Sequence, residues 1–331
     1  MSIRIEVVHG DALRFPADVL ALKFAQELYG VDAMVVATLQ QNGVDVRSKL
    51  PGVGATLRVN SGNAIAAAEA LFVGVSPLGK FDYQTIREFA HSVLSTLGRE
   101  EPSTQHVAMT LHGGGFGLDE AEAFRSEIAG VLDAVAANQR PERLIRISIV
   151  ERNAPAVERL NALLTSILPT NTVGDGQLKH IAHPQSLGIA RGTLGNVGHE
   201  SNEKPHVFVA MPFAEEYADK FHYGIQGATN AAGYLCERAD LASFTGDVVA
   251  WVKDRIGSAA LVVADLTGAN PNVYLEVGYA WGRGVKTVLI SAKGDELKFD
   301  VRTQRCLIFD SIRHLEELLT EELKALKEAS S

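Results

Sequence analysis

The chain is poor in cysteine, in net positive charge and in long apolar runs. Its two cysteines, Cys236 and Cys306, give no disulfide framework and no metal-ligand spacing, so we expect buried thiols and no metal site. The formal net charge of -9 argues against general nucleic-acid binding, which needs a basic face. No apolar run approaches the roughly 18 residues of a membrane-spanning helix, and MSIRIEVVHGD does not have the shape of a signal peptide. We therefore expect a cytoplasmic protein with neither nucleic-acid nor membrane partners.

What is present is a balanced globular composition, with 46% hydrophobic and 21% charged residues over 331 positions. This length is sufficient for two domains that each bury a core. Apolar β-branched runs alternate with helical patterns in both halves, and the alternation breaks over 169–205, which is rich in Pro, Gly, Asn and Ser. We therefore predict an α/β protein with domains at 1–168 and 206–331, joined by a linker at 169–205.

The periodicity predicts a sheet covered by helices in each domain. In the first, we expect strands at 3–8, 19–22, 56–59, 71–75, 106–110 and 145–150, and helices at 32–41, 83–97, 119–136 and 154–167. In the second, we expect strands at 206–211, 234–237, 260–264, 286–290 and 306–309, and helices at 215–232, 246–256, 271–282 and 312–327. The second set predicts a doubly wound, flavodoxin-like parallel sheet of five strands, whose ligand binds beyond the carboxyl ends of the strands near the switch point.

The stretch NPNVYLEVGYA (270–280) sets one carboxylate in an apolar helix. Asn270 can cap this helix, and Pro271 suits its first position, where no amide hydrogen is needed. Glu276 then lies in the second turn, where the helix dipole does not account for an acid. Because its neighbours at helical spacing are apolar, this carboxylate is costly unless it is paired, solvated in a cleft, or used.

Asp265 closes the apolar stretch that precedes this helix. We predict that Asp265 and Glu276 face one pocket, where one carboxylate acts at an anomeric carbon and the other handles protons. A structural alternative is that Asp265 caps the loop and Glu276 pairs with an arginine such as Arg283 or Arg305. The residues alone leave both interpretations open.

Segment 206–309 resembles the nucleoside 2-deoxyribosyltransferase-like proteins, which are structural relatives of TIR domains. The matching pieces are VFVAMPF, ERAD, GDVVAWVKDRI, KTVLI and, most specifically, ALVVADLTGANPNVYLEVGYAWGRG. The resemblance implies that Glu276 attacks C1′ of a sugar and that Asp265 holds or protonates the substrate. It also implies a set of substrate-binding residues: Met211, Pro212, Phe213, Gly268, Asn270 and Asn272.

Asn270 departs from the transferase pattern, which has an aspartate six residues before the nucleophile. An amide can cap a helix or bond a substrate but cannot shuttle a proton, which places base exchange in doubt. Hydrolysis needs less, and the related TIR enzymes cleave nicotinamide from NAD. Since nicotinamide is a cationic leaving group, it needs no general acid. We therefore expect NAD or a related nucleotide as the substrate, and no cofactor.

In the first half, IEVVHGDALRFPADVLAL (5–22) and AMTLHGGGFGLDEAEAFRSEIAGVLDAV (108–135) form a second matched pair. A strand that runs into HGGGFG and then a helix can cradle a phosphate on backbone amides, although a tight turn is the alternative. Together the two pieces resemble a divergent macro domain of the kind found at the N-terminus of leucine aminopeptidases. The resemblance implies that Asp11 meets an adenine and that an ADP-ribose-like diphosphate binds the loop Gly113, Gly114, Gly115, Phe116 and Gly117.

Combined, these features suggest an N-glycosidic bond hydrolase gated by a macro-like nucleotide sensor, similar to bacterial anti-phage effectors that deplete NAD. Related transferases complete their pocket with a neighbouring subunit, and TIR enzymes become active when they assemble, so we expect a homo-oligomer. Two alternatives stay open. One is a non-catalytic module that binds a nucleotide signal. The other is a housekeeping nucleoside or deoxynucleotide hydrolase, or a deoxyribosyltransferase.

Overall fold

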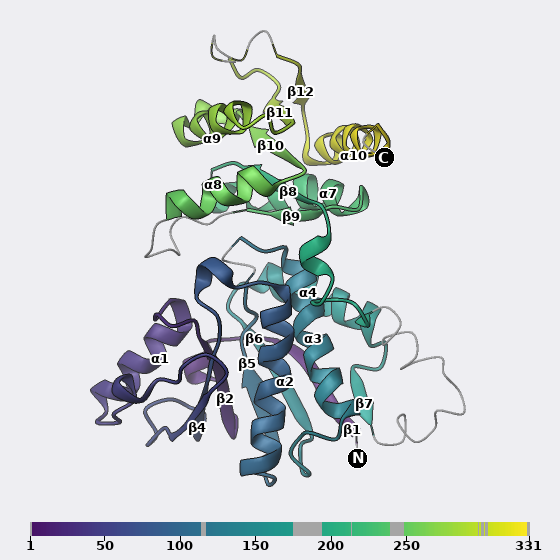
Figure 1. Cartoon of the computed structure of the whole chain (residues 1–331). Helices are drawn as coiled ribbons and strands as arrows, with labels where there is room; N and C mark the ends of the chain where they lie inside the picture. The colour runs from purple at the N-terminus through teal and green to yellow at the C-terminus, as the bar shows by residue number, and fades with distance from the viewer. Residues whose placement is uncertain are drawn as a thin grey trace. The chain divides into compact units, whose positions relative to one another are not determined.

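The chain divides into two compact units in a computed structural model. The structure describes residues 2–113, 117–174, 194–212, 214–238, 248–296, 298, 301 and 304–329. The first unit comprises the described parts of 1–114 and 120–202, and the second those of 115–119 and 203–331. The predicted α/β class is confirmed, since one unit contains a mixed sheet and the other a parallel sheet, each with helices (Figure 1).

The first unit is built on a seven-stranded sheet in the order β3-β4-β2-β5-β6-β1-β7. Its central strands are parallel, whereas β3 and β7 at the two edges run antiparallel to their neighbours. The strands are β1 (Ser2–His9), β2 (Val19–Phe24), β3 (Thr56–Asn60), β4 (Glu69–Gly74), β5 (His106–Met109), β6 (Arg146–Glu151) and β7 (Thr172–Gly174). Every strand predicted in this half is present, and β7 was not predicted.

Four described α-helices accompany this sheet: α1 (Gly30–Gln41), α2 (Tyr83–Glu100), α3 (Glu120–Ala136) and α4 (Ala154–Ile167). Figure 1 shows α2 and α3 side by side. Gly130 makes this close approach possible, because a Cβ atom there would lie 2.0 Å from the carbonyl oxygen of Arg87. Asp82 caps α2 and Asn153 caps α4, each with a side-chain oxygen that accepts a backbone N–H.

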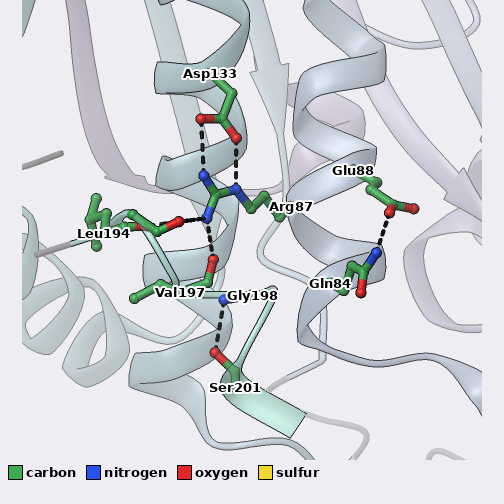
Figure 2. Close-up of polar contacts among 9 residues, drawn as sticks. Gln84, Arg87, Glu88, Asp133, Leu194, Val197, Gly198 and Ser201 are labelled. Carbon is green, nitrogen blue, oxygen red and sulfur yellow. Dashed lines mark hydrogen bonds and ion pairs between the residues drawn. The ribbon is translucent and has the colours of Figure 1, made fainter. Parts of the chain in front are cut away.

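Arg87 of α2 anchors the end of the first unit, and only 6% of it is exposed. Its Nε and Nη2 donate to the two carboxylate oxygens of Asp133 on α3, at 2.6 and 3.0 Å. Its Nη1 donates to the carbonyl oxygens of Leu194, Gly195 and Val197, at 3.1, 2.9 and 2.5 Å (Figure 2). One guanidinium therefore joins two helices to a segment more than 100 residues later in the chain.

The residues after Val197 also contact the helices of the first unit. The backbone of Gly198 has φ +85°, and a Cβ atom there would lie 3.1 Å from the Arg87 side chain, so a glycine is required. Its N–H donates to Ser201 Oγ at 2.8 Å, and Ser201 Oγ donates to Glu122 at 2.5 Å (Figure 2 shows the first of these bonds). Residues 194–202, predicted as part of the linker, thus pack within the first unit. The domain boundaries themselves stay a prediction, and 175–193 lie outside the described residues.

The second unit is a five-stranded sheet in the order β12-β11-β10-β8-β9, and all of its strand pairs are parallel. The strands are β8 (His206–Ala210), β9 (Leu235–Glu237), β10 (Leu261–Asp265), β11 (Thr287–Ala292) and β12 (Cys306–Phe309). This order is that of the flavodoxin-like doubly wound fold, as predicted. Described helices α8 (Val248–Ser258) and α9 (Pro271–Gly282) lie on one side, and α7 (Gly227–Ala231) and α10 (Ile312–Glu328) on the other (Figure 1).

Successive side chains along each strand point to opposite faces of the sheet, which divides the core of this unit into two layers. On β8, Val207 and Val209 belong to the layer that α10 covers, whereas Phe208 and Ala210 belong to the layer that α8 and α9 cover. Helix α10 contributes three fully buried leucines spaced four apart, Leu315, Leu319 and Leu323. Both faces of each central strand are therefore buried, which explains the continuous apolar runs in the sequence.

Two local features differ from the sequence-based prediction. The helix predicted at 215–232 is a 3₁₀ turn (Glu215–Tyr217), a π-helix (Lys220–Gln226) and the short helix α7. Cys306, expected to be buried like Cys236, is half-buried, and burial raises the pKa of its thiol to about 11. Within the described residues, no helix combines the length and apolar character needed to cross a membrane.

Replacing Arg87 tests the anchor. Arg87→Met should lower the free energy of unfolding of the first unit by about 2–3 kcal/mol, because charged hydrogen bonds to Asp133 and to three carbonyls are lost. Urea unfolding of the full chain would measure this change. Arg313→Met is the matched control, since the Arg313 side chain is 87% exposed and its loss should cost at most about 0.5 kcal/mol. An equally small cost for Arg87→Met would refute the anchoring role.

Candidate functional site

The strand order of the second unit places its switch point between β8 and β10. The chain passes from β8 to β9 on one side, and then returns across β8 to β10 on the other. In this fold class, ligands bind beyond the carboxyl ends of the two strands at that point. Here those ends are Ala210 and Asp265. The candidate site is therefore built from the residues that follow these two positions.

Asp265 is fully buried, with 0% exposure, and has two structural contacts. Its Oδ1 accepts the backbone N–H of Thr267 at 3.0 Å, which caps the turn after β10. Its Oδ2 forms an ion pair with Nζ of Lys220, whose side chain is only 10% exposed. The loop-capping alternative for Asp265 is thus observed. Its predicted contact with a substrate stays a prediction.

Lys220 is a residue that the sequence analysis missed. It opens the π-helix that follows β8, and its Nζ lies 4.6 Å from the ring centroid of Tyr217 and 5.8 Å from that of Phe309. A buried lysine costs free energy unless an anion compensates it, and Asp265 supplies that anion. The available signal was a lysine in the helical pattern after the first strand of this unit. Helical periodicity does not distinguish a π-helix from an α-helix, so the position of this side chain could not be predicted.

The turn from β10 to α9 is held by β11 and by the segment after it. Thr267 Oγ1 accepts the N–H of Ala292 at 3.1 Å, and the N–H of Gly268 donates to Asp295 at 2.7 Å. Gly268 has φ +74°, a left-handed conformation that favours glycine. Two contacts from β11 and the residues directly after it therefore fix the point at which α9 begins.

Asn270 caps α9 as predicted, with Oδ1 accepting the N–H of Asn272 at 2.9 Å, and Pro271 occupies the first helical position. The predicted substrate-binding residues Gly268 and Asn270 thus already hold the turn with their N–H and side-chain oxygen, respectively. Asn272 is exposed. Contact of these three residues with a substrate stays a prediction.

Glu276 lies in the second turn of α9 and is half-buried. Burial raises the pKa of its carboxyl group from 4.5 to about 7. Among the described residues, no hydrogen bond or ion pair reaches this carboxylate. Arg305, one of the arginines considered as a partner, pairs instead with Glu322 at 2.8 and 2.6 Å. Burial therefore disfavours the charged form of Glu276, as predicted. The arginine contact of the structural alternative is not observed among the described residues.

The two carboxylates differ in their environments. Asp265 is fully buried and paired with a cation, whereas Glu276 is half-buried and near the midpoint of its titration at neutral pH. Carboxylates in such different environments can divide chemical roles, with the paired one organising the site and the unpaired one acting on the substrate.

The end of β8 supplies the other predicted substrate-binding residues. Met211 is 3% exposed and Pro212 is half-buried, and Phe213 lies outside the described residues. The guanidinium of Arg238, which directly follows β9, lies near Met211, with 3.7 Å between Nη1 and Sδ. A cavity of about 240 Å³ lies elsewhere, between the amino ends of β11 and β12 and helix α10, and is therefore not at the switch point.

The predicted sensor residues are only partly described, and Gly117 falls in the second unit. Asp11 Oδ1 accepts the N–H of Leu13 at 3.0 Å, and its Oδ2 lies 3.4 Å from Arg152. Gly113 and Gly117 each have φ +95°, and Gly114, Gly115 and Phe116 lie outside the described residues. The adenine contact of Asp11 and the diphosphate contacts of the glycine loop therefore stay predictions.

Buried ionisable groups lie close to the start of this loop, and the sequence analysis did not identify them. His112 is 3% exposed, and burial lowers its pKa well below the usual value. Glu127 of α3 has 0% exposure, and burial raises its pKa to about 8, so it is mostly protonated at neutral pH. Lys23 and Asp32 form a buried pair at 2.8 Å.

No family model matches the sequence, and no curated protein matches it. Among solved structures, an Oceanobacillus iheyensis macrodomain with ADP is 12% identical, and the match covers 51% of this chain and 97% of that one with a TM-score of 0.39. The macrodomain of Thermus aquaticus DarG is 13% identical over 44% of this chain and 97% of its own, with a TM-score of 0.34. The Clostridium botulinum CMP N-glycosidase BcmB is 21% identical over 35% of this chain and 98% of its own, with a TM-score of 0.30. All of these likenesses are distant.

The ion pair at the switch point can be tested by a double-mutant cycle. Lys220→Met should destabilise the second unit by about 3–5 kcal/mol, because it leaves the Asp265 charge buried without its cation. Adding Asp265→Asn to Lys220→Met should recover part of that loss, since the unpaired charge is then removed. Chemical unfolding of Lys220→Met, Asp265→Asn and the double variant gives the coupling free energy. Strictly additive effects of the two substitutions would contradict the pairing.

Proposed function

We propose that the second unit hydrolyses the N-glycosidic bond of NAD or a related nucleotide, with Glu276 at the anomeric carbon. The observation that carries the proposal is the state of Glu276: a half-buried carboxylate, without an ion-pair partner among the described residues, whose pKa is about 7. It lies on the helix that directly follows the switch-point strand. The likeness of 206–309 to nucleoside 2-deoxyribosyltransferase-like proteins, carried by ADLTG and NPNVYLEVGYA, agrees with this role.

The proposed reaction needs one carboxylate at the sugar. The bond between C1′ and the base nitrogen breaks with its electron pair going to the base, and C1′ acquires oxocarbenium character. The Glu276 carboxylate stabilises this positive charge, or bonds C1′ transiently. Water then adds its oxygen to C1′, and any bond between Glu276 and C1′ breaks with its electron pair returning to the carboxylate. The proton that water releases is accepted by the Glu276 carboxylate. Nicotinamide leaves NAD as a neutral molecule, so this step requires no acid.

Asp265 has a supporting role in this proposal. Since it is buried and paired with Lys220, it acts by holding the turn that positions α9. Asn270 caps the helix with its side-chain oxygen. Since its amide cannot transfer a proton, this residue favours hydrolysis over base exchange.

The first unit is proposed to bind a nucleotide signal, and the whole chain to act as an anti-phage effector that assembles into a homo-oligomer. Support for this part comes from the HGD and HGGGFG segments and from two left-handed glycines, Gly113 and Gly117, at the ends of the loop. A non-catalytic nucleotide-binding module is the second candidate, and it is favoured if Glu276 proves dispensable.

Glu276→Gln should lower base release by about 100-fold or more, because it keeps the side-chain shape and removes the charge that stabilises the transition state. Liquid chromatography of nicotinamide or free base from NAD, nucleotides and nucleosides would measure this. Glu317→Gln is the control, since the Glu317 side chain is 60% exposed on α10. Undiminished release by a folded Glu276→Gln protein would make this carboxylate structural.

The raised pKa of Glu276 gives two pH dependences of known sign. Catalysis that needs the carboxylate should fall about tenfold per pH unit below about 7 and level off above it. The effect on stability has the opposite sign. Since the folded pKa of Glu276 lies above its unfolded value of 4.5, the contribution of this group to the free energy of unfolding is fully present below pH 4.5. It is lost as pH rises through 7. The stability of Glu276→Gln relative to the wild type should therefore increase from pH 5 to pH 8. A pH-independent difference in melting temperature would contradict the assignment.

Binding by the first unit can be measured in the full-length Glu276→Gln protein, which should not consume its ligand. Calorimetry with ADP-ribose should give binding that Gly113→Val weakens by at least tenfold, because φ +95° and close approach to a diphosphate both require glycine. Equal affinity of both proteins would leave HGGGFG as a structural turn.

A further inference from the structure

Tyr217 lies at the switch point and contacts the cation of the Lys220–Asp265 pair. It ends the 3₁₀ turn Glu215–Tyr217 after β8, and its half-buried side chain packs against the core layer that α10 covers. Nζ of Lys220 lies over its ring, 4.6 Å from the ring centroid, which is the geometry of a cation–π interaction. The ring and the Asp265 carboxylate therefore bind the same ammonium group.

The hydroxyl end of this side chain lies beside the turn that leads to α9. A Cβ atom on Gly268 would lie 3.9 Å from the hydroxyl oxygen, an ordinary van der Waals distance. The pKa of the hydroxyl is raised first by a hydrogen bond to Glu216, and then by burial and nearby carboxylates, which include Asp265 and Asp295. Those two carboxylates accept backbone N–H groups of the turn. One side chain thus extends from the ammonium group of Lys220 to the turn.

The surroundings of the ammonium group explain why the ring matters. Lys220 is 8% exposed, and its Nζ also lies 5.8 Å from the ring centroid of Phe309, at the end of β12. An ion pair holds its geometry best where water is excluded, because water screens the attraction between the charges. The negative faces of aromatic rings attract the cation and also exclude water. Without the Tyr217 ring, we expect water to reach the pair and to loosen the contact between Lys220 and Asp265.

We propose that Tyr217 is a positioning residue for the proposed reaction. Its ring holds Lys220 against Asp265, and that pair fixes the turn at which the helix of Glu276 begins. The inference rests on the proposed function for the reaction itself, whereas the contacts that it uses lie wholly within the second unit. It assigns the role to the ring and not to the hydroxyl group. Phenylalanine should therefore replace Tyr217, and leucine should not.

An unfolding cycle on the full chain tests the contact without any substrate. Tyr217→Leu should change the equilibrium constant of urea unfolding about 3- to 30-fold less in a Lys220→Met/Asp265→Asn background than in the wild type, because only the wild type has a cation for the ring. Tyr217→Phe should show little of this difference, since it keeps the ring. Tyr223→Leu is the matched control, because Tyr223 lies in the π-helix and is 49% exposed, and its effect should be the same in both backgrounds. Equal effects of Tyr217→Leu in the two backgrounds would overturn the proposal.

Steady-state kinetics of base release, measured well below the melting temperature of each variant, test the positioning. Tyr217→Leu should lower kcat about tenfold or more and change KM less than about threefold, because a displaced carboxylate at position 276 weakens a contact made in the transition state. Tyr217→Phe should keep most of kcat, and Tyr223→Leu should change neither constant. A wild type that releases base, with kcat unchanged in Tyr217→Leu or equally lowered in Tyr217→Phe, would overturn the positioning role alone. Coupling in the unfolding cycle, together with a wild type that releases no base, would refute the glycosidase and retain Tyr217 as the residue that holds the ion pair.

Discussion

The ion pair between Lys220 and Asp265 is the interaction on which the candidate site depends. It joins the helix after β8 to the end of β10, the two sides of the switch point. Asp265 also caps the turn at Thr267, and that turn fixes where α9 begins and so where Glu276 stands. A buried charge pair is a poor source of net stability but a strong constraint on geometry, because neither partner can move without leaving the other unpaired.

This constraint separates the roles of two carboxylates that look alike in the sequence. Asp265 is fully buried and paired with Lys220, whereas partial burial without a cation brings Glu276 close to half ionisation at neutral pH. The proposed site therefore combines a buried ion pair with a carboxylate that titrates near neutral pH. Cleavage of an N-glycoside requires both elements, a rigid frame and a group at C1′.

Local sequence chemistry was sufficient to predict much of the fold. Apolar runs gave the strands of both sheets, and Asn270 with Pro271 predicted the start of α9, because capping depends on residues next to one another. Interactions between distant segments were missed. The carbonyls that Arg87 binds lie 107 to 110 residues away, and β7 forms only through its pairing with β1. Lys220 was missed for the same reason, since its partner Asp265 comes from another strand.

The most direct test of the central claim is a crystal structure of the Glu276→Gln protein with a bound nucleotide substrate. The account predicts the sugar at the carboxyl edge between β8 and β10, with C1′ about 3–3.5 Å from the side chain at position 276, the separation of a reactive pair. A nucleotide bound only in the first unit, or one in the second unit whose C1′ lies far from position 276, would contradict it.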